Sequence, residues 1–151
     1  MSTADRVGRT IFERAIMLDS GPLISLYSPR DTRRQTIAEE LKRLQMLKYP
    51  VCTTYLTVAE THRRLLFDVG HLDAVRFLKN VHDGSVNILE VTAADVCEAI
   101  GIIERYSDQL ITCCDAVSMA LMKRFGIRKV LSYDHHFWIL NFEVLQGGWI
   151  G

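Results

Sequence analysis

The sequence lacks a hydrophobic run long enough to cross a bilayer, and it lacks an excess of charge of either sign. Residues 99–103 form one of the longest apolar runs, whereas a membrane-spanning helix needs about 18 such residues. Lys and Arg number 18, as do Asp and Glu, so the formal net charge is zero. Residues 1–14 contain Asp5 and Glu13 and no apolar stretch, which is not the pattern of a secretory signal. We therefore expect a cytoplasmic protein without a membrane segment.

Several common site motifs are also missing. The four cysteines include no Cys-x-x-Cys pair, and the five histidines show no ligand spacing with them, so neither zinc nor a disulfide framework is indicated. We expect four reduced and mostly buried thiols. There is no Gly-x-Gly-x-x-Gly, no phosphate-binding loop ending in Gly-Lys-Ser/Thr and no Gly-x-Ser-x-Gly. These absences argue against dinucleotide-binding proteins, P-loop enzymes and serine hydrolases.

What remains is a composition suited to one packed domain. The chain has 151 residues, of which 48% are hydrophobic and 24% charged. A chain of this length buries about 70% of the surface that it exposes when unfolded, which supports one core and not two. We expect a single domain over residues 15–151, preceded by an N-terminal extension over residues 1–14.

Short apolar runs alternate with helical patterns along this domain. The predicted strands are residues 15–18, 51–54, 86–91 and 129–133, with a fifth, edge strand at 142–145. The predicted helices are residues 20–27, 31–48, 56–70, 71–83, 92–105 and 116–125. Strands that alternate with helices are typical of a mainly parallel sheet. We therefore predict an α/β three-layer sandwich with a four- to five-stranded sheet.

The neutral total hides an uneven distribution of charge. Residues 30–48 hold six basic side chains against three acidic ones, whereas residues 80–115 hold one basic side chain against seven acidic ones. Solvated helix faces account for most runs of this kind. An acidic centre flanked by basic segments is also what a metal site that handles a polyanion needs.

Four carboxylates stand out within this pattern. Asp19 and Asp134 follow predicted buried strands, and the carboxyl ends of parallel strands border the crevice in which α/β proteins bind ligands. Glu60 and Asp115 interrupt apolar helical patterns. Each has a structural interpretation as well, since Asp115 could cap a helix and Glu60 could pair with a neighbouring arginine. Four acids in one small fold nevertheless favour a shared site.

Clustered carboxylates without His or Cys suit hard cations such as Mg²⁺ or Mn²⁺. Such ions commonly activate water and stabilise the leaving oxygen in phosphodiester cleavage. Asp19 could instead accept a phosphoryl group, but haloacid-dehalogenase-like enzymes have Asp-x-Asp at this strand end, and here the chain reads Asp19-Ser20-Gly21.

The order of these motifs resembles the PIN domain family, and within it the toxin ribonucleases of VapBC-like toxin–antitoxin pairs. The resemblance covers about residues 15–146. It rests on Asp19-Ser20 after the first strand, on Glu60, on Asp115-Ala116, and on the run from Leu131 to Phe137. Strand one usually begins almost at the initiator Met in this family, whereas here about fourteen residues precede it.

The resemblance implies a Mg²⁺- or Mn²⁺-dependent endoribonuclease. Asp19, Glu60, Asp115 and Asp134 would be its catalytic and metal-binding residues, supported by other polar side chains. The supporting residues would be Ser20, Ser132 and, in second rank, Asp108. Arg63, Arg64 and His136 are candidates for substrate contact, although a surface ion pair explains the two arginines about equally well.

The family also implies partners, namely RNA as substrate, a small antitoxin protein, and a second copy of the chain in a homodimer through the helices at 31–48 and 54–83. Two alternatives stay open. One is a PIN-like RNA- or protein-binding module without turnover, which would be marked by loss of an acid. The other is a housekeeping RNA-processing nuclease with no antitoxin.

Overall fold

The computed structural model describes residues 13–84 and 86–147. The predicted extension at 1–14 therefore lies almost wholly outside the described residues. Within them the sheet has five strands in the order β3-β2-β1-β4-β5, and every neighbouring pair is parallel. The strands are β1 (Ile16–Leu18), β2 (Val51–Thr53), β3 (Val86–Ile88), β4 (Lys129–Leu131) and β5 (Glu143–Leu145). The α/β fold class with a parallel sheet is confirmed.

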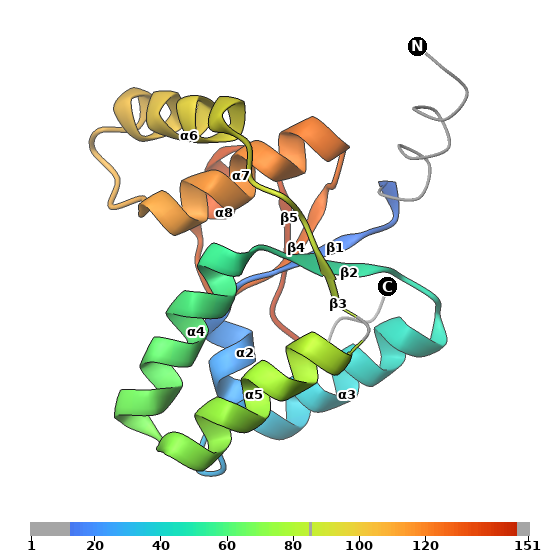
Figure 1. The fold of residues 1–151 in the computed structure, drawn as a ribbon. Coiled ribbons are helices and arrows are strands. Elements are labelled where there is room, and N and C mark those ends of the chain that lie inside the picture. Colours follow the sequence, from blue (N-terminus) through green and yellow to red (C-terminus); the bar gives the residue numbers. More distant parts are fainter. Residues whose placement is uncertain (1–12, 85, 148–151) are drawn as a thin grey trace.

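Helices cover both faces of this sheet and complete three layers (Figure 1). On one face lie α2 (Ser20–Tyr27), α3 (Arg34–Met46), α4 (Tyr55–Asp68) and α5 (His71–Asp83). On the other lie α6 (Ala93–Arg105), α7 (Cys113–Phe125) and the short α8 (His136–Ile139). The helical crossovers let every strand run in the same direction. After β3 the chain crosses back to place β4 beside β1, so β1 and β4 end side by side at the centre of the sheet.

The alternation of side chains along the strands produces two cores. Met17 and Val130 point to the layer of α6, α7 and α8, whereas Leu18 and Leu131 point to the layer of α2 to α5. Because successive residues of a strand face opposite sides, a strand of three apolar residues contributes to both cores. This is why the strands read as continuous apolar runs in the sequence.

Helix starts bring polar residues to the carboxyl edge of the sheet. Asp19 caps α2, Thr54 caps α4 and Thr112 caps α7, each through a side-chain oxygen that accepts a backbone N–H. Gly126 closes α7 in the left-handed region, at φ 72°, where glycine avoids the steric cost that other residues pay. These caps fix where α2, α4 and α7 begin and where α7 ends.

The structure departs from the sequence interpretation in several places. Some elements are shorter than predicted: β3 ends at residue 88, β4 ends at residue 131, and α3 covers residues 34–46. α7 begins at Cys113, three residues earlier than predicted, because Thr112 caps it. The four-residue α8 was not predicted at all. The expectation of mostly buried cysteines was wrong: all four thiols are free, but Cys97 and Cys113 are exposed and only Cys52 is fully buried. None of the described helices is long and apolar enough to cross a membrane.

Candidate active site

A polar cavity of about 360 Å³ opens at the carboxyl edge of the sheet. All four carboxylates singled out from the sequence line it, together with polar, apolar and basic neighbours from α2, α3, α4, α7 and the loop after β4. The lining residues are Asp19, Ser20, Gly21, Ile24, Arg33, Glu60, Arg64, Thr112, Asp115, Tyr133 and Asp134. Four segments far apart in the sequence therefore place an acid at one point.

Asp19 is the most tightly held of the four. It follows β1 directly, is 6% exposed, and accepts the Ser20 backbone N–H at 2.8 Å through Oδ1. Its other oxygen accepts the Ser132 hydroxyl at 2.6 Å. The same Ser132 oxygen accepts the backbone N–H of Asp134 at 2.9 Å. Ser132 thus ties the end of β1 to the loop after β4 and fixes two of the acids relative to each other.

Asp134 is anchored on its other side by His136. The His136 backbone N–H donates to Asp134 Oδ1 at 2.9 Å, and the His136 Nδ1 atom lies 2.8 Å from the same oxygen. The His136 side chain is only 12% exposed. The structure thus places the ring of His136, a predicted substrate-contact residue, against Asp134.

Asp115 sits in the first turn of α7. Thr112 caps this helix and its hydroxyl accepts the Asp115 backbone N–H at 3.2 Å. Asp115 is therefore not the cap, and its carboxylate is free to face the cavity while remaining 8% exposed. A carboxylate at a helix start is stabilised by the helix dipole.

Glu60 comes from α4, whose Thr57, Thr61 and Leu65 point into the protein. Glu60 is half-buried and turned toward the start of α7. The sequence alternative, pairing with Arg63 or Arg64, is not found: Arg64 lies 3.9 Å from Asp68, and Arg63 stacks over Phe67 at 5.6 Å. Glu60 is thus left available to the cavity.

Crowding these carboxylates together shifts their proton affinities. Burial, the Asp19 charge and contact with Asp134 raise the pKa of Asp115 to about 8. Burial also raises the pKa of Asp19, against the lowering effect of its bonds from Ser132 and Ser20. Burial acts the same way on Asp134, but the His136 N–H and Asp115 outweigh it and lower the pKa of Asp134 below its usual range. Neighbouring acids with diverging pKa values mark sites that hold a proton or a cation.

The donor set fits a hard divalent cation. The described residues that line the cavity offer carboxylate and hydroxyl oxygens and include no cysteine. Burial raises the pKa of the nearby Cys114 thiol to about 12, so this thiol stays protonated at neutral pH. Asp134, His135 and His136 also bring one ligand atom each within 4.8 Å of one another, a group better suited to transition metals. Asp134 belongs to both groups, but of the three only Asp134 lines the cavity.

Four of the predicted site residues do not line the cavity. Ser132 and His136 lie behind it and contact its acids, whereas Asp108 and Arg63 lie away from it. Asp108 is exposed in the loop between α6 and α7, where it accepts a bond from Gln109 at 3.3 Å. Arg63 also points away, whereas Arg64 lines the cavity. Sequence reasoning missed Arg33 and Tyr133, which line it as well. The Asp31-x-Arg33 spacing carries no site signal by itself, because the partner Tyr133 is one hundred residues further along the chain.

Comparison with known proteins agrees with this geometry. A model of the PIN domain family matches residues 16–142. The structure is similar to VapC20 of Mycobacterium tuberculosis, a sarcin–ricin loop cleaving toxin, with a TM-score of 0.75, 28% identity, and coverage of 85% of this chain and 96% of that one.

It also shares its fold with FitAcB from Neisseria gonorrhoeae, with a TM-score of 0.61, 16% identity, and coverage of 87% and 96%. No match was found among curated protein sequences. The family match spans most of the described domain and contains all four cavity acids. The chain belongs to the PIN domain family.

Proposed function

We propose that the protein is a Mg²⁺- or Mn²⁺-dependent endoribonuclease and the toxin of a toxin–antitoxin pair. The observation that carries this proposal is the convergence of Asp19, Glu60, Asp115 and Asp134 on one cavity. Family membership and the likeness to VapC20, a sarcin–ricin loop cleaving toxin, support the same activity. A carboxylate cluster of this density is costly to maintain unless a cation compensates it.

The position of each residue in the cavity indicates its role. Asp19, Asp115 and Asp134 would hold the ion, and Glu60 would bind it directly or through water, as oxygen ligands suit. A bound divalent ion supplies Lewis-acid stabilisation of developing charge and lowers the pKa of water at the site. Ser132 fixes the positions of Asp19 and Asp134 relative to each other, and Ser20 donates its backbone N–H to Asp19.

The test is RNA cleavage by the purified protein with Mg²⁺ or Mn²⁺ against EDTA, on total RNA and on a sarcin–ricin loop oligonucleotide. Asp19→Asn should abolish cleavage, because it removes one formal charge at nearly constant shape. Asparagine caps a helix as well as aspartate does, so the variant keeps the α2 cap. Its melting temperature without metal should equal or exceed that of the wild type, since fewer like charges repel.

The matched control is Asp83→Asn, an exposed carboxylate at the end of α5 outside the cavity, which should cleave as the wild type does. Unchanged cleavage by Asp19→Asn would contradict the role of that residue. RNA binding without cleavage by any preparation would favour the binding module instead. Cleavage by a chain whose gene has no antitoxin neighbour would favour the housekeeping nuclease.

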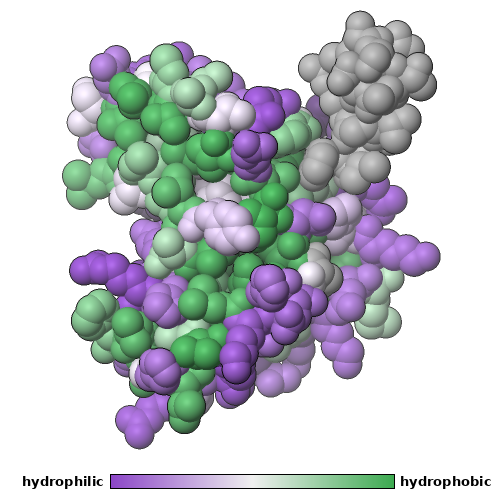
Figure 2. Space-filling model, in the orientation of Figure 1, coloured by the Kyte–Doolittle hydropathy of each residue, from purple (hydrophilic) through white to green (hydrophobic). Residues whose placement is uncertain are grey.

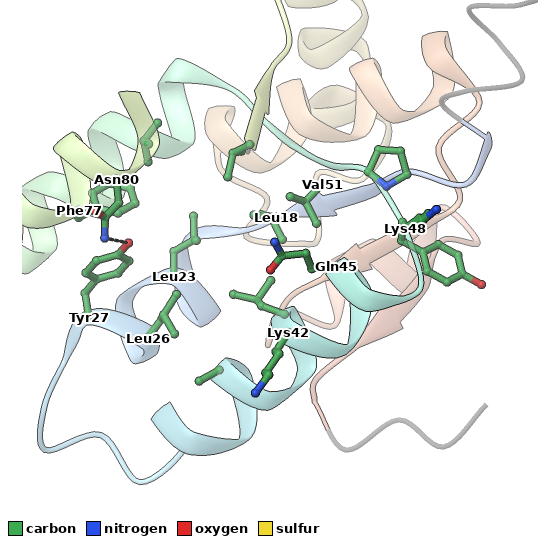
Figure 3. A pocket seen from close by; sticks show the side chains of 16 residues that line it. Leu18, Leu23, Leu26, Tyr27, Lys42, Gln45, Lys48, Val51, Phe77 and Asn80 are labelled. Carbon is green, nitrogen blue, oxygen red and sulfur yellow. Dashed lines mark hydrogen bonds between the residues drawn. The ribbon is translucent and has the colours of Figure 1, made fainter. Parts of the chain in front are cut away.

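An apolar groove on the α2–α3–α5 side offers a place for the antitoxin (Figure 3). It measures about 530 Å³ and is lined by leucine side chains and aromatic rings, among them Leu23, Leu26, Leu41 and Phe77. Lys42 and Lys48 also line it. An amphipathic helix with acidic flanking residues would complement this surface. We assign the groove to the antitoxin and the exposed apolar side chains of α3, α4 and α5 to a homodimer.

A further inference from the structure

Arg33 stands out as a cation held in place at the edge of an acidic cavity. Among the described residues that line the cavity, only Arg33 and Arg64 are basic. Arg64 makes a single loose ion pair, 3.9 Å from Asp68. Arg33 is fixed from two directions although its side chain is 56% exposed.

The first restraint is a fork of hydrogen bonds. Arg33 Nε and Nη2 donate to the two carboxylate oxygens of Asp31, both at 3.3 Å, and the Arg33 backbone N–H donates to Asp31 Oδ1 at 2.8 Å. Asp31 in turn accepts the hydroxyl of the buried Ser25 at 3.0 Å. The carboxylate that orients the arginine is itself oriented by the core.

The second restraint is the Tyr133 ring, over which the Arg33 guanidinium stacks at 4.1 Å. The Tyr133 hydroxyl donates to Ser25 Oγ at 3.0 Å, which closes a loop of contacts from Arg33 through Asp31 and Ser25 back to Tyr133. A side chain at Gly21 would collide with this ring, because a Cβ there would lie 2.9 Å from Tyr133 Cδ2. Glycine at this position therefore lets the ring lie against α2.

This arrangement contributes little to stability, because exposed ion pairs are screened by water and salt. It does hold the Arg33 side chain in one conformation before a ligand binds. Binding therefore costs less side-chain conformational entropy than it would for a freely rotating arginine. A guanidinium has five N–H donors, and the bonds to Asp31 use one on Nε and one on Nη2. The remaining donors of the planar fork suit the oxygens of a phosphate.

We propose that Arg33 binds a backbone phosphate of the RNA and places the chain against the four carboxylates. The inference rests on the proposed function. The cavity acids repel a phosphodiester, and a fixed cation on the cavity wall offsets that repulsion where the strand enters. Arg33 is thus a substrate-binding residue, and Asp31, Ser25 and Tyr133 are positioning residues that act through it.

The test compares Arg33→Ala with Arg30→Ala in cleavage and binding of the RNA that the wild type cleaves. Arg30 is an exposed arginine three residues earlier that does not line the cavity. Arg33→Ala should raise the Kd and KM at least about tenfold, since charge-assisted bonds are strong. It should also reduce the slope of log K against log salt by about 0.7, the value of one phosphate contact to a single strand. Arg30→Ala should do neither.

Two further measurements test whether the Arg33 guanidinium contacts one phosphate of the RNA. Arg33→Lys keeps the charge and loses the fork, so it should restore the salt slope but not the full affinity. Replacing successive RNA phosphates by neutral methylphosphonates should identify one position at which wild type and Arg33→Ala become equal. Equal values for Arg33→Ala and Arg30→Ala, with cleavage by the wild type intact, overturn the assignment of Arg33 alone. Failure of the wild type to bind or cleave RNA overturns the proposed function as well.

Discussion

Asp115 and Asp134 lie against the same cavity but hold protons at different pH values. Asp134 accepts the backbone N–H of His136, which favours its charged form, whereas Asp115 is buried beside other acids. Burial, the Asp19 charge and the contact with Asp134 favour the protonated form of Asp115 by raising its pKa. The pH dependence of stability should therefore report on this residue.

The metal-free protein should lose stability as the pH rises toward 8. In the folded chain the pKa of Asp115 is raised to about 8 from its ordinary value of 3.8, so between these pH values the folded state holds a proton that the unfolded state has released. The free energy of unfolding contributed by this group is fully present below pH 3.8 and is lost as the pH passes 8. Thermal melts of the protein in EDTA from pH 5 to 9 measure the effect.

Asp115→Asn should flatten this profile, because an amide does not titrate, while Asp83→Asn should leave it as in the wild type. Excess Mg²⁺ should reduce the loss at high pH, since the ion binds the ionised carboxylates of the folded state. A profile with the same slope in wild type and Asp115→Asn would show that other groups control the dependence.

At the scale of elements, α3 carries two surfaces with different tasks. Its start presents Arg33 to the acidic cavity, whereas Ala38, Leu41 and Gln45 line the apolar groove. The helix also buries Ile37 and Leu44 completely, so its position is fixed by the core. A single helix thus adjoins both the proposed substrate site and the proposed antitoxin site.

Ala38→Glu should block antitoxin binding and spare RNA cleavage. A glutamate at this position fills part of the groove and introduces a buried charge that a helix with acidic flanking residues cannot pair. Coexpression with the small protein encoded beside the gene, followed by affinity capture, measures binding, and RNA cleavage measures activity. If Ala38→Glu captures the partner as strongly as the wild type does, the groove is not the antitoxin site.

Most elements were predictable because strands and helices carry different periods in this chain. The five strands appear as short apolar runs with turn residues behind them, and their order of appearance implied a parallel sheet. α8 was not predicted because a segment of four residues is too short to show a helical period. The start of α7 was misplaced because two capping residues, Thr112 and Asp115, compete in the sequence and only the structure shows which hydroxyl or carboxylate accepts the bond.

The sequence predicted the acidic residues of the site but not Arg33. Asp19 and Asp134 follow strands, and the topology of a parallel sheet brings such residues to one edge. The Arg33 network depends on contacts between Ser25 and Tyr133, 108 residues apart in the sequence, which no local pattern encodes. The cysteines were misjudged because hydrophobicity alone does not tell which face of α6 or α7 a thiol occupies.

At the scale of the whole molecule, the apolar side chains of α3, α4 and α5 divide into two groups. Leu44, Leu65 and Phe77 are completely buried within the chain. Others are open to solvent, including Met46 at 74%, Phe67 at 75% and Leu72 at 84% exposed. Figure 2 shows apolar surface at the end of the molecule where α4 and α5 meet. Large exposed apolar side chains of this kind mark interfaces.

We expect a symmetric homodimer through this surface. In a two-fold contact the same patch of both copies is buried, so Phe67 and Leu72 of each copy would be covered by the partner. A stable contact would bury about 800 Å² on each copy. Light scattering across micromolar concentrations should give twice the chain mass of 17.2 kDa. The double variant Phe67→Asp, Leu72→Asp should give the chain mass, because it places four carboxylates in an apolar contact.

The control for the dimer is Leu110→Asp, which changes a side chain that is 90% exposed in the loop between α6 and α7. It should remain dimeric if the contact lies on α4 and α5. Dissociation by Leu110→Asp, with the double variant still dimeric, would move the interface to the α6–α7 side. A wild-type protein that stays at the chain mass throughout would show that Phe67 and Leu72 face water, and the active unit would then be one chain with one carboxylate cavity.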